Sequence, residues 1–232
     1  MTKKIVCALI IFGLMLPVLC IPVSADYFPF ADISKNSWQY EPVKRAYELG
    51  LMNGVSSKRF DPNKQLTRAE AAMILYNLKS SGESYVRYSF KDVKAGAWYA
   101  DAVEWMYRRG ITSGVTKDRF GVNEYITRQD LVTMIYRMYE DEWGLGGRNK
   151  DIYVREGLVS SFKDSYKISS YALPAMTLAT GICMIITHDP TKHCNVSPII
   201  TGHNGMINPK GFCTRAEAAV IIEKVYIIDT YI

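Results

Sequence analysis

Cysteine and net charge are both scarce in this chain of 232 residues. It has five cysteines, and its formal net charge at pH 7 is only +5. Small secreted domains built on disulfides carry an even number of cysteines spread along the chain, whereas Cys183, Cys194 and Cys213 lie together in its last quarter. We therefore exclude a disulfide-built fold. The weak positive charge also argues against a nucleic-acid partner.

Long hydrophobic runs are missing outside the N-terminus. Residues 5–19 form an apolar run after two lysines, and small residues follow at Val23 and Ala25. This pattern predicts a signal peptide over residues 1–25, cleaved before Asp26. A membrane anchor is the alternative, but the run is short and prolines interrupt its end. Once the two lysines leave, 26 basic and 23 acidic residues remain, and we expect no stable membrane insertion of the mature chain.

Motifs of enzymes and metal sites are also missing. The sequence has no GxSxG, no glycine-rich phosphate loop and no HExxH. All three histidines fall between residues 183 and 213, together with the last three cysteines, but without a CxxC or HxxxH spacing. We expect a loop with incidental cysteines, or a disulfide between Cys183 and Cys194, ahead of a zinc site. No catalysed reaction and no cofactor are predicted.

An internal repeat organises the chain. Each copy opens with Phe-x-Asp, continues with a Gly-Leu or Gly-Ile pair, and ends with Thr-Arg before an apolar run. The aspartates are Asp32, Asp92 and Asp164, and the arginines are Arg68, Arg128 and Arg215. We expect repeats over residues 28–82, 88–141 and 160–229.

The third copy is degenerate. Trp38 and Trp98 follow the Phe-x-Asp motif in the first two copies, whereas two serines stand in that region of the third. Gly181-Ile182 is matched with Gly50-Leu51 of the first copy, and the distance from this glycine to the Thr-Arg pair is then 16 residues longer than in the other copies. An insertion is therefore expected near residues 183–205.

Each copy has the pattern of two helices joined by a loop. In the first copy, Gly50 is a plausible C-terminal stop, and Thr67 with Glu70 forms a capping box that opens the second helix. Two such short helices cannot bury their apolar faces alone, so three copies should pack around a shared core. The predicted fold is mainly α, with three helix-loop-helix repeats in one helical bundle.

Several residue types are expected to serve the fold. Cys213 aligns with Leu66 and Ile126, which predicts a small buried hydrophobe. Trp38 and Trp98 stand at helical spacing and are expected to be partly buried. The phenylalanines assigned to the core are Phe30, Phe60, Phe90, Phe120 and Phe162.

The repeated arginine stands at an unfavourable place. Arg68 falls in the first turn of its helix, where the partial positive charge of the N-terminus disfavours a cation by up to about 1 kcal/mol. The same placement occurs three times. One explanation is an ion pair with the aspartate of the same repeat or with the neighbouring acid, such as Glu70. The other is an anionic ligand. Both can hold, with the aspartate positioning the arginine.

Taken together, the triplicate motifs and the export signal resemble the S-layer homology family, over about residues 28–229. The resemblance implies a pseudo-threefold helical bundle that binds secondary cell-wall polysaccharide attached to peptidoglycan. Binding in that family is non-covalent, lies in grooves between repeats, and often involves a pyruvate ketal on an N-acetylmannosamine residue. No reaction is catalysed. A bacterial cell-wall or cell-surface location is implied.

The resemblance also implies roles for individual residues. Arg68, Arg128 and Arg215 match the binding arginine, and they would read a carboxylate beside free N–H groups of the helix N-termini. Trp38 and Trp98 would offer flat faces to sugar rings. Gly54 and Gly114 would let the backbone approach the ligand. The third groove would differ because its tryptophan is missing.

A second hypothesis is a structural or interaction protein of the cell surface, whose third repeat binds a protein partner or a metal. Wall binding that depends on Arg68 and Arg128 would favour the first hypothesis. Partner capture or zinc retention that depends on residues 183–213 would favour the second.

Overall fold

The computed structural model describes residues 28–143, 152–154, 157–184 and 198–231. The predicted signal peptide and the predicted partner of Cys183, which is Cys194, lie outside these residues. Among the residues that the structure describes, no helix combines the length and the apolar character needed to cross a bilayer.

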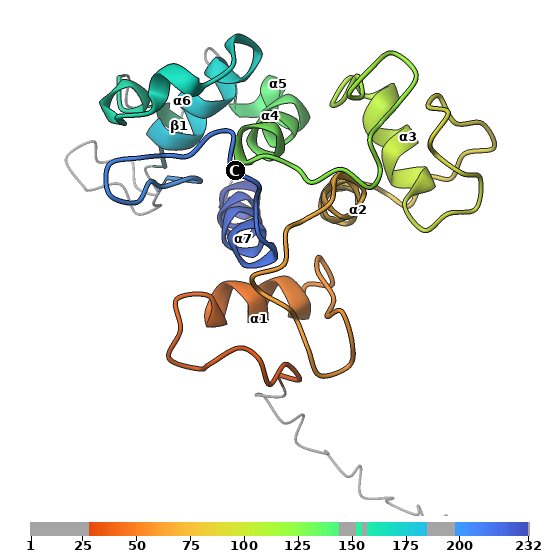
Figure 1. Cartoon of the computed structure of the whole chain (residues 1–232), viewed down its shortest axis with the longest axis horizontal. Helices are drawn as coiled ribbons and strands as arrows, with labels where there is room; N and C mark the ends of the chain where they lie inside the picture. The colour runs from red at the N-terminus through yellow and green to blue at the C-terminus, as the bar shows by residue number, and fades with distance from the viewer. Residues whose placement is uncertain (1–27, 144–151, 155–156, 185–197, 232) are drawn as a thin grey trace, which may run out of the picture.

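The fold is mainly helical, as predicted, and has three lobes around a common centre (Figure 1). Three central helices begin at the repeated arginines: α2 (Arg68–Lys79), α4 (Arg128–Met138) and α7 (Arg215–Tyr231). The outer helices are α1 (Tyr40–Glu48), α3 (Ala100–Arg108) and α6 (Leu173–Gly181). The short elements are α5 (Glu140–Trp143), the 3-10 helices η1 (Val159–Ser161), η2 (Ser165–Lys167) and η3 (Ser170–Ala172), and the strands β1 (Ile152–Val154) and β2 (Ile182–Met184).

Each outer helix packs on the central helix of another repeat. Helix α3 contacts α2, α6 contacts α4, and α1 of the first repeat contacts α7 of the last. The three repeats therefore close into a ring. No repeat buries its own helix pair, so the shared core is a property of the whole ring.

A ring of backbone hydrogen bonds marks the centre. The N–H of Leu66 donates to the Cys213 carbonyl (2.8 Å), that of Cys213 to Ile126 (2.9 Å), and that of Ile126 back to Leu66 (2.9 Å). All three side chains are fully buried, which confirms the prediction for Cys213. Burial raises the pKa of the Cys213 thiol to about 12, with a further contribution from Glu217. The thiol therefore stays protonated and packs as an apolar group.

The aromatic residues divide into two groups. Phe30, Phe60, Phe90 and Phe120 are buried as predicted, and Phe162 packs half-buried against the core. The tryptophans do not follow their prediction: Trp38 is 66% exposed and Trp98 is 61% exposed. Helical spacing does not apply to them, because α1 begins at Tyr40 and α3 at Ala100, each two residues beyond the tryptophan.

The third repeat differs where its outer helix ends. Gly50 and Gly110 follow α1 and α3 with positive φ of 68° and 70°. Gly181 is instead the last residue of α6, and the chain continues into β2, which pairs antiparallel with β1. The match of Gly181 with Gly50 was therefore wrong, because the helix runs directly into a strand and needs no left-handed turn there.

Candidate functional site

Each repeated aspartate is linked to an arginine of another repeat through one peptide group. The Asp92 carboxylate accepts the Gly121 N–H (2.8 Å), and Arg68 Nε donates to the Phe120 carbonyl (2.8 Å). This carbonyl and this N–H belong to the same peptide group. The carboxylate and the guanidinium thus hold it from opposite sides, and charge-assisted hydrogen bonds of this kind are stronger than neutral ones.

The same arrangement occurs three times around the ring. Asp32 binds the Asp61 N–H (2.7 Å) while Arg215 Nε binds the Phe60 carbonyl (2.8 Å); Asp164 binds the Asn208 N–H (2.9 Å) while Arg128 Nε binds the Ile207 carbonyl (3.1 Å). The direct ion pair with the aspartate of the same repeat, one of the predicted alternatives, is not found among the described residues.

Hydrogen bonds fix the charge of two of these aspartates. Burial by itself would raise the pKa of Asp32, but the backbone N–H groups of Phe60 and Asp61 outweigh it, so the pKa is lowered. Asp92 behaves in the same way, through the N–H groups of Phe120, Gly121 and Val122. Both carboxylates are therefore ionised near neutral pH and turned toward the loop.

The loop residue in each bridge has a left-handed backbone. φ is 59° at Asp61, 81° at Gly121 and 49° at Asn208. Gly adopts this conformation freely, and Asp and Asn tolerate it better than other residues. The sequence therefore varies at this position only among residues that allow the turn, which keeps the peptide bridge in all three repeats.

The glycines that recur in the repeats serve this loop. A Cβ on Gly54 would lie 2.3 Å from the Phe30 ring, and one on Gly114 would lie 2.5 Å from the Phe90 ring. Gly202 stands in the same relation to Phe162, at 2.4 Å. The structure thus gives these glycines a packing reason of their own, and it identifies Gly202 as the third member, inside the segment that was predicted to be inserted.

The helix N-termini offer no free N–H groups to a ligand in their first turns. The Arg68 N–H donates to the Glu124 carbonyl (2.8 Å), and the Ala69 N–H donates to Val122 (3.3 Å). The corresponding bonds run from Arg128 to Gly211, from Gln129 to Pro209, from Arg215 to Lys64 and from Ala216 to Pro62. Neighbouring loops therefore use the donors that were predicted for an anion, and that part of the prediction was wrong.

The arginine side chains are what remains for a ligand. Arg68, Arg128 and Arg215 are only 6%, 9% and 6% exposed. The guanidinium of Arg68 lies over the Phe120 ring at 4.8 Å, and that of Arg215 lies over Phe60 at 4.5 Å. Burial lowers the pKa of both arginines, against the raising effect of nearby acids. Arginine remains charged in proteins, so each provides a fixed, partly desolvated cation.

One pocket, of about 430 Å³, opens beside Arg68. We call it the Arg68 pocket. Residues 111–115 of the second repeat form one wall, and Asp130 and Arg137 of α4 form another. Tyr171 of the third repeat completes it. Three repeats therefore contribute to one pocket.

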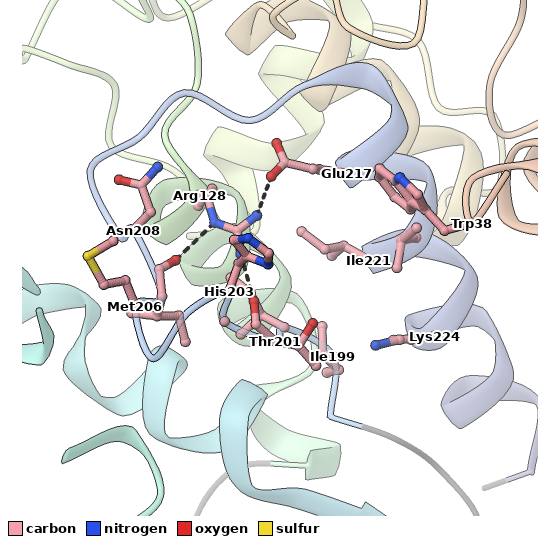
Figure 2. A pocket seen from close by; sticks show the side chains of 14 residues that line it. Trp38, Arg128, Ile199, Thr201, His203, Met206, Asn208, Glu217, Ile221 and Lys224 are labelled. Atoms are coloured by element: carbon pink, nitrogen blue, oxygen red, sulfur yellow. Dashed lines mark hydrogen bonds and ion pairs between the residues drawn. The ribbon is translucent and has the colours of Figure 1, made fainter. Parts of the chain in front are cut away.

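A second pocket, of about 400 Å³, opens beside Arg128 and is shown in Figure 2. We call it the Arg128 pocket. Residues 199–203 and 206–208 of the third repeat line it, together with Glu217 and Lys224 of α7. Trp38 of the first repeat stands at its edge (Figure 2).

The two pockets are equivalent positions of the repeat. The matched pairs are Arg68 and Arg128, Asp130 and Glu217, Thr133 and Val220, Met134 and Ile221, Arg137 and Lys224, and Tyr171 and Trp38. Each arginine thus meets the loop of the next repeat and an aromatic ring of the repeat after that. The arginine and the tryptophan of one repeat do not share a pocket.

The third equivalent position lies at Arg215. Its Nη2 donates to the Asn53 carbonyl, and its Nη1 lies 4.0 Å from the Glu70 carboxylate. By the order of the ring, Trp98 is the matching aromatic residue, since α3 packs on α2. Asn77 replaces the second cation here. Lys64 of the first repeat binds the Glu70 carboxylate at 3.0 Å, so a second cation stands at this position on a different element.

Sequence reasoning missed Tyr171. The third repeat does have an exposed aromatic residue at the tryptophan position, since Tyr171 is 52% exposed and lines the Arg68 pocket. It stands one residue later than the Phe-x-Asp spacing predicts, beside the serines that were matched with tryptophan. The signal was an aromatic residue next to the expected position, displaced by one residue.

Comparisons with known proteins agree with this architecture. A family model for the S-layer homology domain matches residues 29–72 and 89–132. The chain is 33% identical over 195 residues to an amylopullulanase of Thermoanaerobacterium thermosulfurigenes, which covers 83% of this chain and 9% of that protein. It is also 33% identical over 195 residues to an exoglucanase of Acetivibrio thermocellus, covering 83% and 16%.

A surface-layer 125 kDa protein of Lysinibacillus sphaericus is 29% identical over 185 residues, covering 79% of this chain and 14% of that protein. The chain thus spans less than a fifth of the length of these relatives. What the proteins share is the repeat region, whatever else each relative carries. By the family match and the repeat architecture, the chain carries S-layer homology domains, at residues 29–72 and 89–132.

Proposed function

We propose that the chain anchors to the bacterial cell wall by non-covalent binding of secondary cell-wall polysaccharide. Its S-layer homology domains, and relatives named as surface-layer and cell-surface proteins, indicate a protein of the cell surface or cell wall. The alignment over 195 residues is longer than the first two repeats together. This length supports residues 160–229 as a third, degenerate repeat.

The ligand class follows from the pockets. A cation that is nine-tenths buried beside an exposed aromatic ring suits a sugar that carries a carboxylate. The guanidinium can take the carboxylate with a two-pronged pair of hydrogen bonds, and the ring can pack on an apolar sugar face. Pockets of 400–430 Å³ are large enough for about one sugar residue. A pyruvate ketal is the carboxylate that we propose.

The single observation that carries this proposal is the buried arginine in each pocket, held by a peptide bridge and facing an aromatic ring. Such a cation costs desolvation energy, which an anionic ligand can offset. Trp38 and Trp98 would stack on sugar rings, and their exposure supports this role. Asp32, Asp92 and Asp164 would act through the loop, by positioning the arginines. Gly54 and Gly114 would contribute by shaping the pocket wall.

Co-sedimentation tests the proposal. Residues 26–232 would be mixed with purified wall sacculi, before and after chemical removal of the pyruvate ketals, alongside an Arg68→Ala/Arg128→Ala variant. Arg87→Ala is the matched control, since Arg87 is exposed and lies outside both pockets. We expect binding to be lost with the ketals or with the two pocket arginines only. Equal pelleting in every sample would contradict carboxylate recognition.

A further inference from the structure

The two pockets contain equivalent residues, but their arginines are bonded differently. All three nitrogens of Arg128 are used: Nε by the Ile207 carbonyl, Nη1 by Glu217 at 2.7 Å and Nη2 by the Thr201 carbonyl at 3.1 Å (Figure 2). Arg68 uses Nε alone, for the Phe120 carbonyl. Among the described residues, its two Nη atoms make no hydrogen bond and no ion pair.

The neighbouring acid explains the difference. In the Arg128 pocket, Glu217 takes the Thr214 N–H with Oε2 (2.8 Å) and reaches Arg128 with Oε1. In the Arg68 pocket the acid is Asp130, which is shorter by one methylene. Its Oδ2 accepts from the Thr127 hydroxyl at 2.6 Å. The other oxygen, Oδ1, corresponds to Glu217 Oε1, the oxygen that pairs with Arg128.

Tyr171 occupies that second oxygen. Its hydroxyl donates to Asp130 Oδ1 at 2.6 Å, and Gln129 Nε2 donates to the same hydroxyl at 3.0 Å. Burial raises the pKa of Tyr171, and the bond to Asp130 raises it further, so the hydroxyl keeps its proton. Trp38, at the matching place in the Arg128 pocket, makes no such bond among the described contacts. The tyrosine of the degenerate repeat thus bonds the acid whose counterpart in the Arg128 pocket pairs with the arginine.

We propose that the Arg68 pocket is the dominant carboxylate site of this chain, and that Tyr171 is a positioning residue that holds Asp130 away from Arg68. The inference rests on the proposed function. A ligand carboxylate can meet both Nη atoms of Arg68 at once, whereas in the Arg128 pocket it must compete with Glu217 for Nη1 and with the Thr201 carbonyl for Nη2. Net charge does not distinguish the pockets, because each has two cations and one acid: Arg68, Arg137 and Asp130 against Arg128, Lys224 and Glu217.

Calorimetric titration of residues 26–232 tests this inference. The probe is the methyl glycoside of N-acetylmannosamine carrying the pyruvate ketal. We expect one dominant site per chain, and a loss of affinity that is larger for Arg68→Ala than for Arg128→Ala. Glu217→Gln should strengthen binding in the Arg128 pocket, because it removes the negative charge beside Nη1, but this site should stay weaker because Nη2 is still bonded to the Thr201 carbonyl. Arg87→Ala is the charge-matched control.

The decisive variants concern Tyr171. Tyr171→Phe keeps the ring but frees Asp130 to pair with Arg68, so we expect affinity to fall roughly tenfold, as for loss of a charge-assisted contact. Adding Asp130→Asn should restore it, because the amide carries no charge. A merely structural role for Tyr171 would not give this rescue. Thermal unfolding of each variant shows whether the fold is intact.

Three results would overturn the inference: unchanged affinity in Tyr171→Phe, no rescue by Asp130→Asn, or a larger loss from Arg128→Ala than from Arg68→Ala. If sacculi still bind through the arginines in such a case, the proposed function stands and only the inference fails. If neither sacculi nor the probe bind the wild-type chain, the proposed function fails and the inference falls with it.

Discussion

The second and third repeats differ widely in sequence and little in their buried hydrogen bonds. Both keep the aspartate, the peptide bridge and the glycine beneath a phenylalanine, even though Phe120 becomes Ile207 and Gly121 becomes Asn208. The differences gather around the repeated arginines: Trp98 against Tyr171, and Asp130 against Glu217. The closed ring of repeats therefore constrains the loop backbone, whereas the residues beside the arginines are free to diverge.

The largest expected effect comes from the glycines that the two repeats share. Gly114→Ala and Gly202→Ala each place a Cβ within about 2.5 Å of a phenylalanine ring and a backbone carbonyl. We expect each to lower the free energy of unfolding by roughly 3 kcal/mol or more. Gly110→Ala, where φ is 70° but space is open, should cost only about 1 kcal/mol. Urea unfolding measures the free energy of unfolding of each variant. A small loss for Gly202→Ala beside a large loss for Gly114→Ala would mean that the two glycines do not have the same packing role.

The central ring should respond unequally in the two repeats. Ile126→Ala removes a large buried side chain and should cost about 2–5 kcal/mol. Cys213→Ala removes only a thiol, so we expect about 1 kcal/mol. Chemical denaturation of both variants measures the pair. An equal cost would mean that the packing around Cys213 is tighter than around Ile126.

Low pH should destabilise the loops whose backbone N–H groups bind Asp32 and Asp92. The folded-state pKa of Asp32 and Asp92 is lowered, so their contribution to stability is present above the ordinary value of 3.8 and is lost as the pH falls through the lowered value. We expect the free energy of unfolding to decline below about pH 4. Asp92→Asn, which turns an amide donor toward backbone N–H groups, should cost about 2 kcal/mol at pH 7 and flatten this decline. Denaturation from pH 2 to 7 is the measurement; an unchanged slope would contradict the assignment.

The smallest expected effect concerns the acids that differ between the two repeats. In α2, the Thr67 and Glu70 pair makes a complete capping box, whereas Asp130 is too short to reach back to the Thr127 N–H. Asp130→Glu should therefore stabilise the fold by a few tenths of a kcal/mol, and Glu217→Asp should destabilise it by about 1 kcal/mol through loss of its cap and ion pair. Thermal unfolding would show opposite shifts. Shifts of the same sign would contradict the capping argument.

The helices and their central position could be predicted because their signals are local. Thr67 with Glu70 opens a helix whatever surrounds it, and repetition in triplicate implies a shared core. The packing of each outer helix and loop on the central helix of another repeat could not be predicted. No local sequence pattern indicates which loop contacts which helix N-terminus. For that reason the peptide bridge from Arg68 to Asp92 and the satisfied N–H groups of α2 are visible only in the structure.

Only part of the site could be predicted, because only some of its residues carry a local sequence signal. The arginines were found because a cation in the first turn of a helix contradicts the helix dipole. Tyr171 was missed because one residue of displacement hides it from alignment, and Gly202 was missed because the match of Gly181 shifted the register of the third repeat. The loop with incidental or disulfide-bonded cysteines, expected ahead of a zinc site, stays a prediction, since Cys194 lies outside the described residues.

Arg68 is proposed to bind a carboxylate of the wall polymer, and a binding cycle can test this role. The affinities of the wild-type chain and of Arg68→Ala would be measured for intact sacculi and for sacculi without pyruvate ketals. We predict that Arg68→Ala weakens binding to intact sacculi at least about tenfold, since a charge-assisted pair is lost, and has little effect once the ketals are removed. A loss of the same factor on both kinds of sacculi would contradict the claim, because the arginine would then act on something other than the ketal.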